Sequence, residues 1–219
     1  MTSQVGATRD AVVLIHGLWL NRAALWPLAR RLRQAGFSVY PFSYPSVHLD
    51  LHGNAARLAA FVRGIDAGTV HLVGHSLGGV VIRALLNDFP DLAPGRVVTL
   101  GSPHGGSIVG RQRARSRLWR LLLGRAVAQL NAGEPARWPV PPREIGTVSG
   151  THSFGAARLV YRSLPRPNDG LLTVAETQWQ GARDAITLPV SHTGMLLSAR
   201  VADAVAAFLR HGSFAAHPS

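Results

Sequence analysis

Two residue types are missing from this chain of 219 residues. It has no cysteine, which excludes a disulfide framework and any metal site that depends on thiolate ligands. It also has no lysine, so its 23 basic residues are all arginine, and against 11 acidic residues they give a formal net charge of +12. Without cysteines, the sequence does not indicate whether the protein resides in an oxidising or a reducing compartment. The excess of arginine would suit an anionic partner.

Long apolar runs are missing as well. The chain has no run of roughly 18 or more consecutive apolar residues, so we expect no membrane-spanning helix. The segment Met1–Asp10 is short and polar, and it lacks the basic region followed by an apolar region that marks a secretory signal. We therefore expect a cytoplasmic protein.

The arginine excess allows two interpretations. An all-arginine choice is typical of GC-rich coding, but it also gives a surface that attracts anionic partners such as nucleic acid or anionic lipid. No RNA-binding, zinc-finger or helix-turn-helix signature supports a nucleic-acid partner. We therefore expect no nucleic-acid partner. We interpret the positive charge as a property that modulates the function and does not define it.

Strand-like and helix-like runs alternate along the chain, which predicts an α/β fold with a mostly parallel sheet covered by helices on both faces. The length suits one domain spanning residues 1–219. Apolar runs predict strands at 11–15, 37–42, 70–73, 96–100, 145–149 and 185–190. Helical spacing predicts helices at 21–34, 54–64, 80–86 and 195–210, the last with Leu197, Val201, Val205 and Phe208 on one side.

Residues 107–143 interrupt this alternation with an arginine-rich run, an apolar run and a proline-rich loop. We expect the segment to leave the sheet and form a helix over it. One interpretation is a covering helix with a solvated arginine face. The other is a lid or interfacial helix whose apolar residues meet acyl chains while its arginines face phosphates or water. Those apolar residues would be Leu118, Trp119, Leu121 and Leu122.

The most informative pattern is Gly74-His75-Ser76-Leu77-Gly78, a match to G-x-S-x-G. It lies between an apolar run and a helix-like run, and a tight turn between a strand and a helix exposes the serine for nucleophilic attack. The alternative is a glycine-rich helix start with Ser76 as its cap. The strand–turn–helix context favours the nucleophile, which needs a base and a fixed geometry.

A serine nucleophile requires a histidine base and an acid that orients the base, here in the chain order Ser, Asp or Glu, His. His192 follows the last expected strand, at the sheet end where ligands bind, and we take it as the base over His104, which occurs too early. Asp169, in the turn-rich loop Asn168-Asp169-Gly170, is our candidate acid. Asp184 and Glu176 are the alternatives.

Backbone amides near the nucleophile are the candidates for stabilising an oxyanion. The segment 16–19 directly follows the first strand, and Gly17 within it allows a sharp turn, which would leave the N–H groups of Leu18 and Leu77 to donate to the developing charge. We expect an apolar substrate pocket with contacts from Trp19, His104 and Trp119.

Together these segments resemble α/β-hydrolase fold serine hydrolases of the small bacterial lipase and esterase kind. The matching segments are 12–17, 74–79, 101–107, 168–170 and 191–194, in the order that the family shows. The resemblance implies Ser76 as nucleophile, Asp169 as acid, His192 as base, and Leu18 and Leu77 as oxyanion donors. It also implies a bacterial source, no cofactor and no metal, and the short chain leaves room for a minimal cap or none.

We therefore expect a serine carboxylic-ester hydrolase that forms an acyl-enzyme on acyl esters, among them short- or medium-chain glycerides. The same residues could serve an acyltransferase, a thioesterase or an amidase, because fold and triad do not separate these reactions. An inactive hydrolase-fold binding module is a further alternative. Peripheral contact with an anionic lipid surface would be compatible with the esterase.

Overall fold

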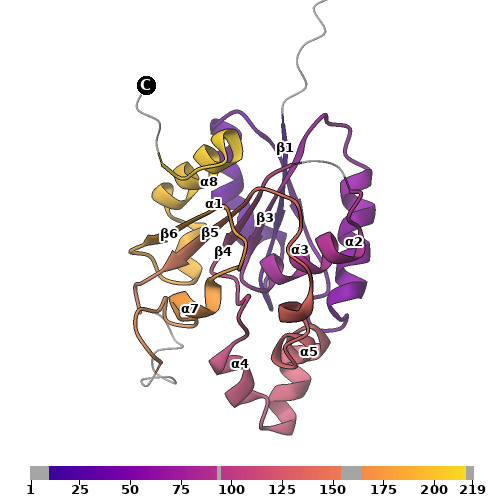
Figure 1. The fold of residues 1–219 in the computed structure, drawn as a ribbon, viewed down its shortest axis with the longest axis vertical. Helices are drawn as coiled ribbons and strands as arrows, with labels where there is room; N and C mark the ends of the chain where they lie inside the picture. The colour runs from indigo at the N-terminus through magenta and orange to yellow at the C-terminus, as the bar shows by residue number, and fades with distance from the viewer. Residues whose placement is uncertain (1–9, 93–94, 154–163, 216–219) are drawn as a thin grey trace, which may run out of the picture.

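A computed structural model of the chain describes residues 10–92, 95–153 and 164–215, so most of the segment searched for a secretory signal lies outside the described residues. A six-stranded, parallel sheet in the order β2-β1-β3-β4-β5-β6 forms its centre (Figure 1). The strands are β1 (Ala11–Ile15), β2 (Ser38–Phe42), β3 (Val70–His75), β4 (Val97–Leu100), β5 (Ile145–Gly150) and β6 (Asp184–Leu188). The predicted strands and their parallel arrangement are confirmed, with small shifts at the strand ends.

Helices cover both faces of the sheet, as the alternating pattern predicted (Figure 1). α1 (Trp26–Gln34) and α8 (Ala199–His211) pack on one face, and α2 (Leu51–Arg63) and α3 (Leu77–Asp88) pack on the other. Along β1, Val13 and Ile15 enter one apolar core while Val12 and Leu14 enter the other. Because successive side chains of a strand point to opposite faces, a strand between two helical layers must be apolar throughout. No described helix has the length and apolar character needed to span a bilayer.

All four predicted helices begin at residues other than those expected, and a capping side chain explains the start of two of them. α2 begins at Leu51 because the Asp50 carboxylate accepts a hydrogen bond from the Gly53 amide at 2.7 Å and caps the helix. α8 begins only at Ala199, after the short 3-10 helix η3 (Thr193–Leu196) and a cap at Ser198. The expectation that Leu197 lies on the apolar face of this helix is therefore wrong, since its side chain is 61% exposed.

Residues 107–143, which we call the excursion, contain two helices where the sequence predicted one. α4 (Ile108–Arg113) and α5 (Arg117–Asn131) project beyond the end of the sheet, and a 3-10 turn, η2 (Pro135–Arg137), follows (Figure 1). Gly124 divides α5, because its φ of 78° is not helical and any Cβ there would overlap the Val47 carbonyl. The half after Gly124 packs into the core, and the half before it carries most of the exposed side chains.

His52 on α2 links three segments of the fold. Its Nδ1 lies 2.7 Å from Asp88 at the end of α3, and its Nε2 lies 2.6 Å from Glu134, which follows α5. The hydrogen bond to Asp88 raises the pKa of His52, slight burial opposes the rise, and the hydrogen bond to Glu134 adds to it. Protonated His52 therefore ties the end of the excursion to α2 and α3.

We predict that this link makes stability depend on pH through His52. Because its pKa is raised by folding, its contribution is fully present below the ordinary value of 6.5 and is lost as pH rises through the folded value. The melting temperature of the wild type should exceed that of His52→Gln at about pH 5.5, and the difference should shrink by about pH 8.5. Comparing the two proteins cancels the contributions of the other histidines. A difference that stays constant across this range would contradict the prediction.

Candidate active site

Ser76 occupies a strained turn between β3 and α3. Its φ of 55° and ψ of −125° lie in a region that non-glycine residues rarely adopt. Close packing holds the turn in place, because a Cβ at Gly74 would overlap the backbone of Gly79, and a Cβ at Gly78 would overlap the carbonyl of Ile15. Such strain persists only where the surroundings enforce it, and it concentrates at functional sites. The geometry matches the turn that the G-x-S-x-G pattern predicted.

The structure brings three of the sequence-predicted residues into one hydrogen-bonded chain. The Oγ atom of Ser76 lies 3.0 Å from Nε2 of His192, and Nδ1 of His192 lies 2.7 Å from Oδ2 of Asp169. The His192 side chain is 11% exposed and that of Asp169 is 1% exposed. This arrangement can move a proton from the serine hydroxyl to the imidazole, while the carboxylate fixes the ring orientation.

The carboxylate of Asp169 is held in its ionised form. Burial opposes ionisation, but the charge and hydrogen bond of His192 and the amides of Leu172 and Leu171 outweigh it, so the pKa of Asp169 lies below its ordinary value. Those amides donate to Oδ1 at 2.7 Å and 2.9 Å. The Asp169 carbonyl also accepts from the His192 amide at 2.9 Å, which joins the two loops through their backbones.

The alternative acids and the other candidate histidine are engaged elsewhere. Glu176 caps α7 (Val174–Thr177) by accepting from Thr173, and Asp184 accepts from the Phe214 amide beyond the end of α8. His104 is 3% exposed, lies against Trp179, and contacts Thr99 Oγ1 at 3.1 Å. His104 does not line the cavity beside Ser76, so its predicted contact with substrate stays a prediction.

His75 occupies the unspecified position before the serine in G-x-S-x-G, and the sequence analysis did not assign it a role in the site. Its Nε2–H donates to the His192 carbonyl at 3.0 Å, and the two rings lie 4.9 Å apart. Burial, with the nearby His192, lowers the pKa of His75 to about 3, so its imidazole is neutral. The histidine next to Ser76 in the turn could have indicated a residue that contacts the site. Because the base was chosen by chain order, however, every histidine before Ser76 was excluded.

The loop after β1 is fixed beside the serine. His16 stacks on Tyr44, donates from Nδ1 to the Gly17 carbonyl at 2.8 Å, and accepts the Tyr44 amide at 3.3 Å. Desolvation lowers the pKa of His16, which matches a neutral ring that donates at one nitrogen and accepts at the other. A Cβ at Gly17 would lie 2.9 Å from Ser76 Cβ, so this loop approaches the serine closely. The predicted oxyanion donors, Leu18 and Leu77, both line the cavity at Ser76.

That cavity, of about 450 Å³, is mostly apolar. Trp19 and Trp119 line it, as the sequence analysis expected of them. Its other apolar lining residues come mainly from the excursion and from the loop after Asp169, namely Val109, Leu123, Val127, Leu130, Leu171 and Leu172. Leu118, Leu121 and Leu122 do not line this cavity, because all three point to the surface. Leu123, Val127 and Leu130 are spaced at i, i+4 and i+7 in the sequence. This spacing could have predicted that one face of a helix forms a wall of the cavity.

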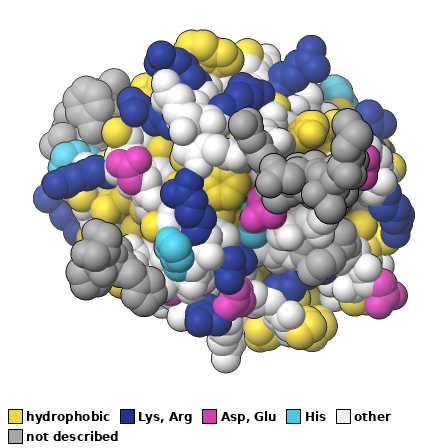
Figure 2. Space-filling view, turned by 90° about the horizontal axis from the view of Figure 1, so that it is seen from above, with side chains coloured by type: hydrophobic (Ala, Val, Ile, Leu, Met, Phe, Trp, Pro, Cys, Tyr) yellow, Lys and Arg dark blue, Asp and Glu magenta, His cyan; other side chains and the backbone are white. Residues whose placement is uncertain are grey.

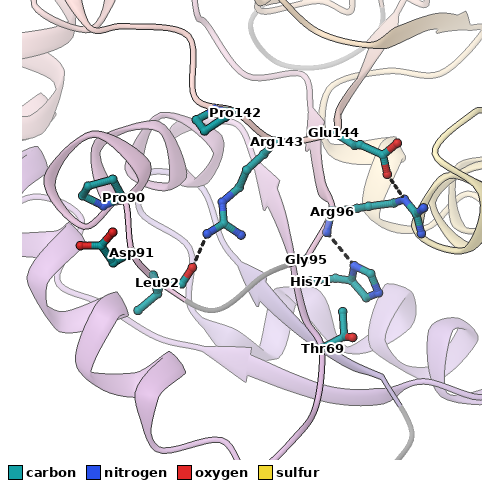
Figure 3. A pocket seen from close by; sticks show the side chains of 10 residues that line it. All are labelled: Thr69, His71, Pro90, Asp91, Leu92, Gly95, Arg96, Pro142, Arg143 and Glu144. Atoms are coloured by element: carbon teal, nitrogen blue, oxygen red, sulfur yellow. Dashed lines mark hydrogen bonds and ion pairs between the residues drawn. The ribbon is translucent and has the colours of Figure 1, made fainter.

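A second cavity, of about 460 Å³, lies where β3, β4 and β5 begin (Figure 3). It contains His71, Arg96, Arg143 and Glu144. Arg96 donates to Glu144 at 2.5 Å and to the Leu209 carbonyl at 2.9 Å, while Arg143 donates to the Leu92 carbonyl. These hydrogen bonds tie neighbouring segments together, which favours a structural role for the charged groups.

Comparisons with known proteins agree with this architecture. The model of the alpha/beta hydrolase family matches residues 12–217. A lipase of Bacillus licheniformis in propeptide form is 24% identical with a TM-score of 0.72, over 87% of this chain and 48% of the lipase. A metagenomic carboxyl esterase is 17% identical with a TM-score of 0.70, over 86% of this chain and 66% of the esterase. A thioesterase of the prodiginine pathway in Streptomyces coelicolor is 17% identical with a TM-score of 0.61, over 94% and 91%. The chain thus spans about half of the lipase.

We predict that His75 positions His192 and thereby sets the reactivity of Ser76. A fluorophosphonate attacks only an activated serine, so its labelling rate measures that reactivity. His75→Met loses the donor and should be labelled about two- to tenfold more slowly, the equivalent of one net hydrogen bond. His75→Gln offers an amide N–H at a similar distance and should be labelled near the wild-type rate. Equal rates for the wild type and the folded Met variant would contradict the prediction.

Proposed function

The chain belongs to the alpha/beta hydrolase family, and on that premise we propose that it is a serine carboxylic-ester hydrolase of the lipase and esterase kind. One observation carries the proposal, namely the hydrogen-bonded chain from Ser76 through His192 to Asp169 beside an apolar cavity. The lipase and esterase similarities support the fold alone at their level of identity. The activity is therefore argued from the geometry of the site.

The first half of the reaction forms an acyl-enzyme. His192 Nε2 takes the proton of the Ser76 hydroxyl as Oγ attacks the ester carbonyl carbon. Asp169 stabilises the resulting imidazolium, and the amides of Leu18 and Leu77 donate to the oxyanion. When the tetrahedral intermediate collapses, His192 gives its proton to the leaving alkoxide, and an alcohol departs. An oxyanion donor of this kind contributes about 3 kcal/mol to transition-state stabilisation.

The second half releases the acid. His192 takes a proton from a water molecule, whose oxygen attacks the acyl carbon, and it then returns the proton to Ser76 Oγ. The lowered pKa of Asp169 keeps its carboxylate charged through both halves. The neutral His75 adds no second positive charge next to the imidazolium, because its pKa of about 3 is far below that of an ordinary histidine.

The cavity supports acyl esters as the substrate class. Its walls are aliphatic and aromatic, and its volume of about 450 Å³ is in the range of small-molecule sites. Short- or medium-chain acyl groups, including those of glycerides, have the apolar surface that such walls bury favourably. Trp19 and Trp119 are proposed substrate contacts on the same grounds.

We predict that Ser76→Ala lowers kcat/KM for p-nitrophenyl butyrate at least about a thousandfold with an unchanged melting temperature, because the nucleophile is lost. The butyryl thioester and the butyryl anilide should be hydrolysed more slowly than the ester by the wild type. Hydrolysis by Ser76→Ala at the wild-type rate would refute the proposal. A faster thioester or amide reaction would assign the site to a thioesterase or amidase, and an absence of turnover with an absence of fluorophosphonate labelling would favour a binding module.

We predict that Val127 controls the accepted acyl length. It is 6% exposed and lines the cavity from the buried half of α5, so Val127→Trp fills the space and Val127→Ala enlarges it. The ratio of octanoate to acetate hydrolysis should fall at least about tenfold in the first variant and rise in the second, since each buried methylene contributes about 0.8 kcal/mol. Phe61→Trp on the outer side of α2 is the control and should leave the ratio unchanged. Parallel shifts in both Val127 variants would place acyl binding elsewhere.

A further inference from the structure

The excursion carries a concentrated positive charge. We define the arm as residues 108–125, which comprise α4 and the first half of α5 and contain Arg111, Arg113, Arg115, Arg117, Arg120 and Arg125. The sequence has no acidic residue between Asp91 and Glu134. All of these arginines except Arg113 are exposed. The arm is therefore cationic without compensating acidic groups in its own segment.

The arm also exposes apolar side chains. Leu118 is 63% exposed, Leu121 is 74% exposed and Leu122 is 43% exposed, and their spacing puts them on one side of α5. Trp19, itself 57% exposed, donates from its indole N–H to the Leu122 carbonyl at 2.9 Å, so it joins the same patch. An exposed apolar patch that is surrounded by charged residues marks an interaction site.

The patch lies beside the cavity of Ser76. Trp19, Arg113 and Trp119 line that cavity, and Arg113 stacks over the Trp119 ring at 4.6 Å. At the opposite end of the molecule, acidic side chains stand among the arginines (Figure 2). Exposed leucines and a run of arginines thus occur together on the arm, beside the cavity.

We propose that the arm docks the protein on an anionic lipid surface. Leu118, Leu121 and Trp19 would enter the boundary between headgroups and acyl chains, while the arginines bind lipid phosphates. A soluble acidic partner would use the arginines but would not require several leucines on one helical turn. Docking is independent of Ser76. The further consequence, that an ester enters the cavity from the lipid surface, rests on the proposed function.

The test measures binding without catalysis, so its failure differs from a failure of the ester hydrolase. The full chain with Ser76→Ala is sedimented with vesicles of phosphatidylcholine, and with vesicles in which about a third of the lipid is phosphatidylglycerol. We expect binding to the second kind only, and release by high salt, because salt screens exposed charges. Binding equal on both vesicle kinds, or on neither, would overturn the proposal.

Two matched pairs of variants locate the surface. Arg117→Gln/Arg120→Gln should weaken partitioning about 25-fold, at about fivefold per arginine near an anionic surface, whereas Arg30→Gln/Arg57→Gln changes net charge equally on α1 and α2 and should have a much smaller effect. Leu118→Ser/Leu121→Ser should weaken it at least about tenfold, and Leu197→Ser, at a leucine 61% exposed elsewhere, should not.

Three results would count against this surface. Equal losses in the two arginine pairs would mean that net charge alone attracts the vesicles. Unchanged binding in the leucine pair would mean a purely electrostatic partner. Conversion of a dimer to a monomer by the leucine pair, with vesicle binding retained, would assign the patch to a second copy of the chain. Circular dichroism checks folding, and the arginine pairs decide the matter if the leucine variant fails to fold.

Discussion

The left-handed backbone of Ser76 is the constraint on which the site depends. Its φ of 55° turns the chain from β3 directly into α3, and close contacts between glycine backbones and neighbouring segments hold it there. The same tight turn brings Gly17 against the Ser76 Cβ atom, so the loop after β1 and the start of α3 converge at one point. Strain at this residue persists because the backbones at the ends of β1 and β3 and at the start of α3 are closely packed around it.

The imidazoles of His75 and His192 are neighbours near Ser76, but their electrostatic surroundings differ. Nδ1 of His192 lies 2.7 Å from the charged carboxylate of Asp169. His75 is buried with its Nε2–H on a carbonyl, and its pKa is about 3, so it remains neutral. In the proposed mechanism the proton therefore goes to His192 and not to His75. His75 acts on the His192 backbone, which is a positioning effect and leaves the chemistry to its neighbour.

Gly124 divides the excursion into halves with different surroundings. After the kink, Val127 and Leu130 form a wall of the cavity, and before it Leu118 and Leu121 face outward among arginines. A continuous helix would carry one apolar face through both halves, so the kink allows one element to serve the cavity and the surface. The arm also borders the cavity through Trp119, so it lies next to the cavity that contains Ser76, the proposed nucleophile.

The alternating sheet-and-helix pattern and the turn at Ser76 could be predicted from local sequence, because periodicity and glycine requirements are local. The sequence also pointed to Asp169 and His192, since loops at the carboxyl ends of parallel strands converge. Three features became visible only in the folded chain: His104 is buried against Trp179, His75 donates to the His192 carbonyl, and the leucines before the kink in α5 point outward. These contacts join residues far apart in the chain, and no local pattern encodes which side chains fill the space between them.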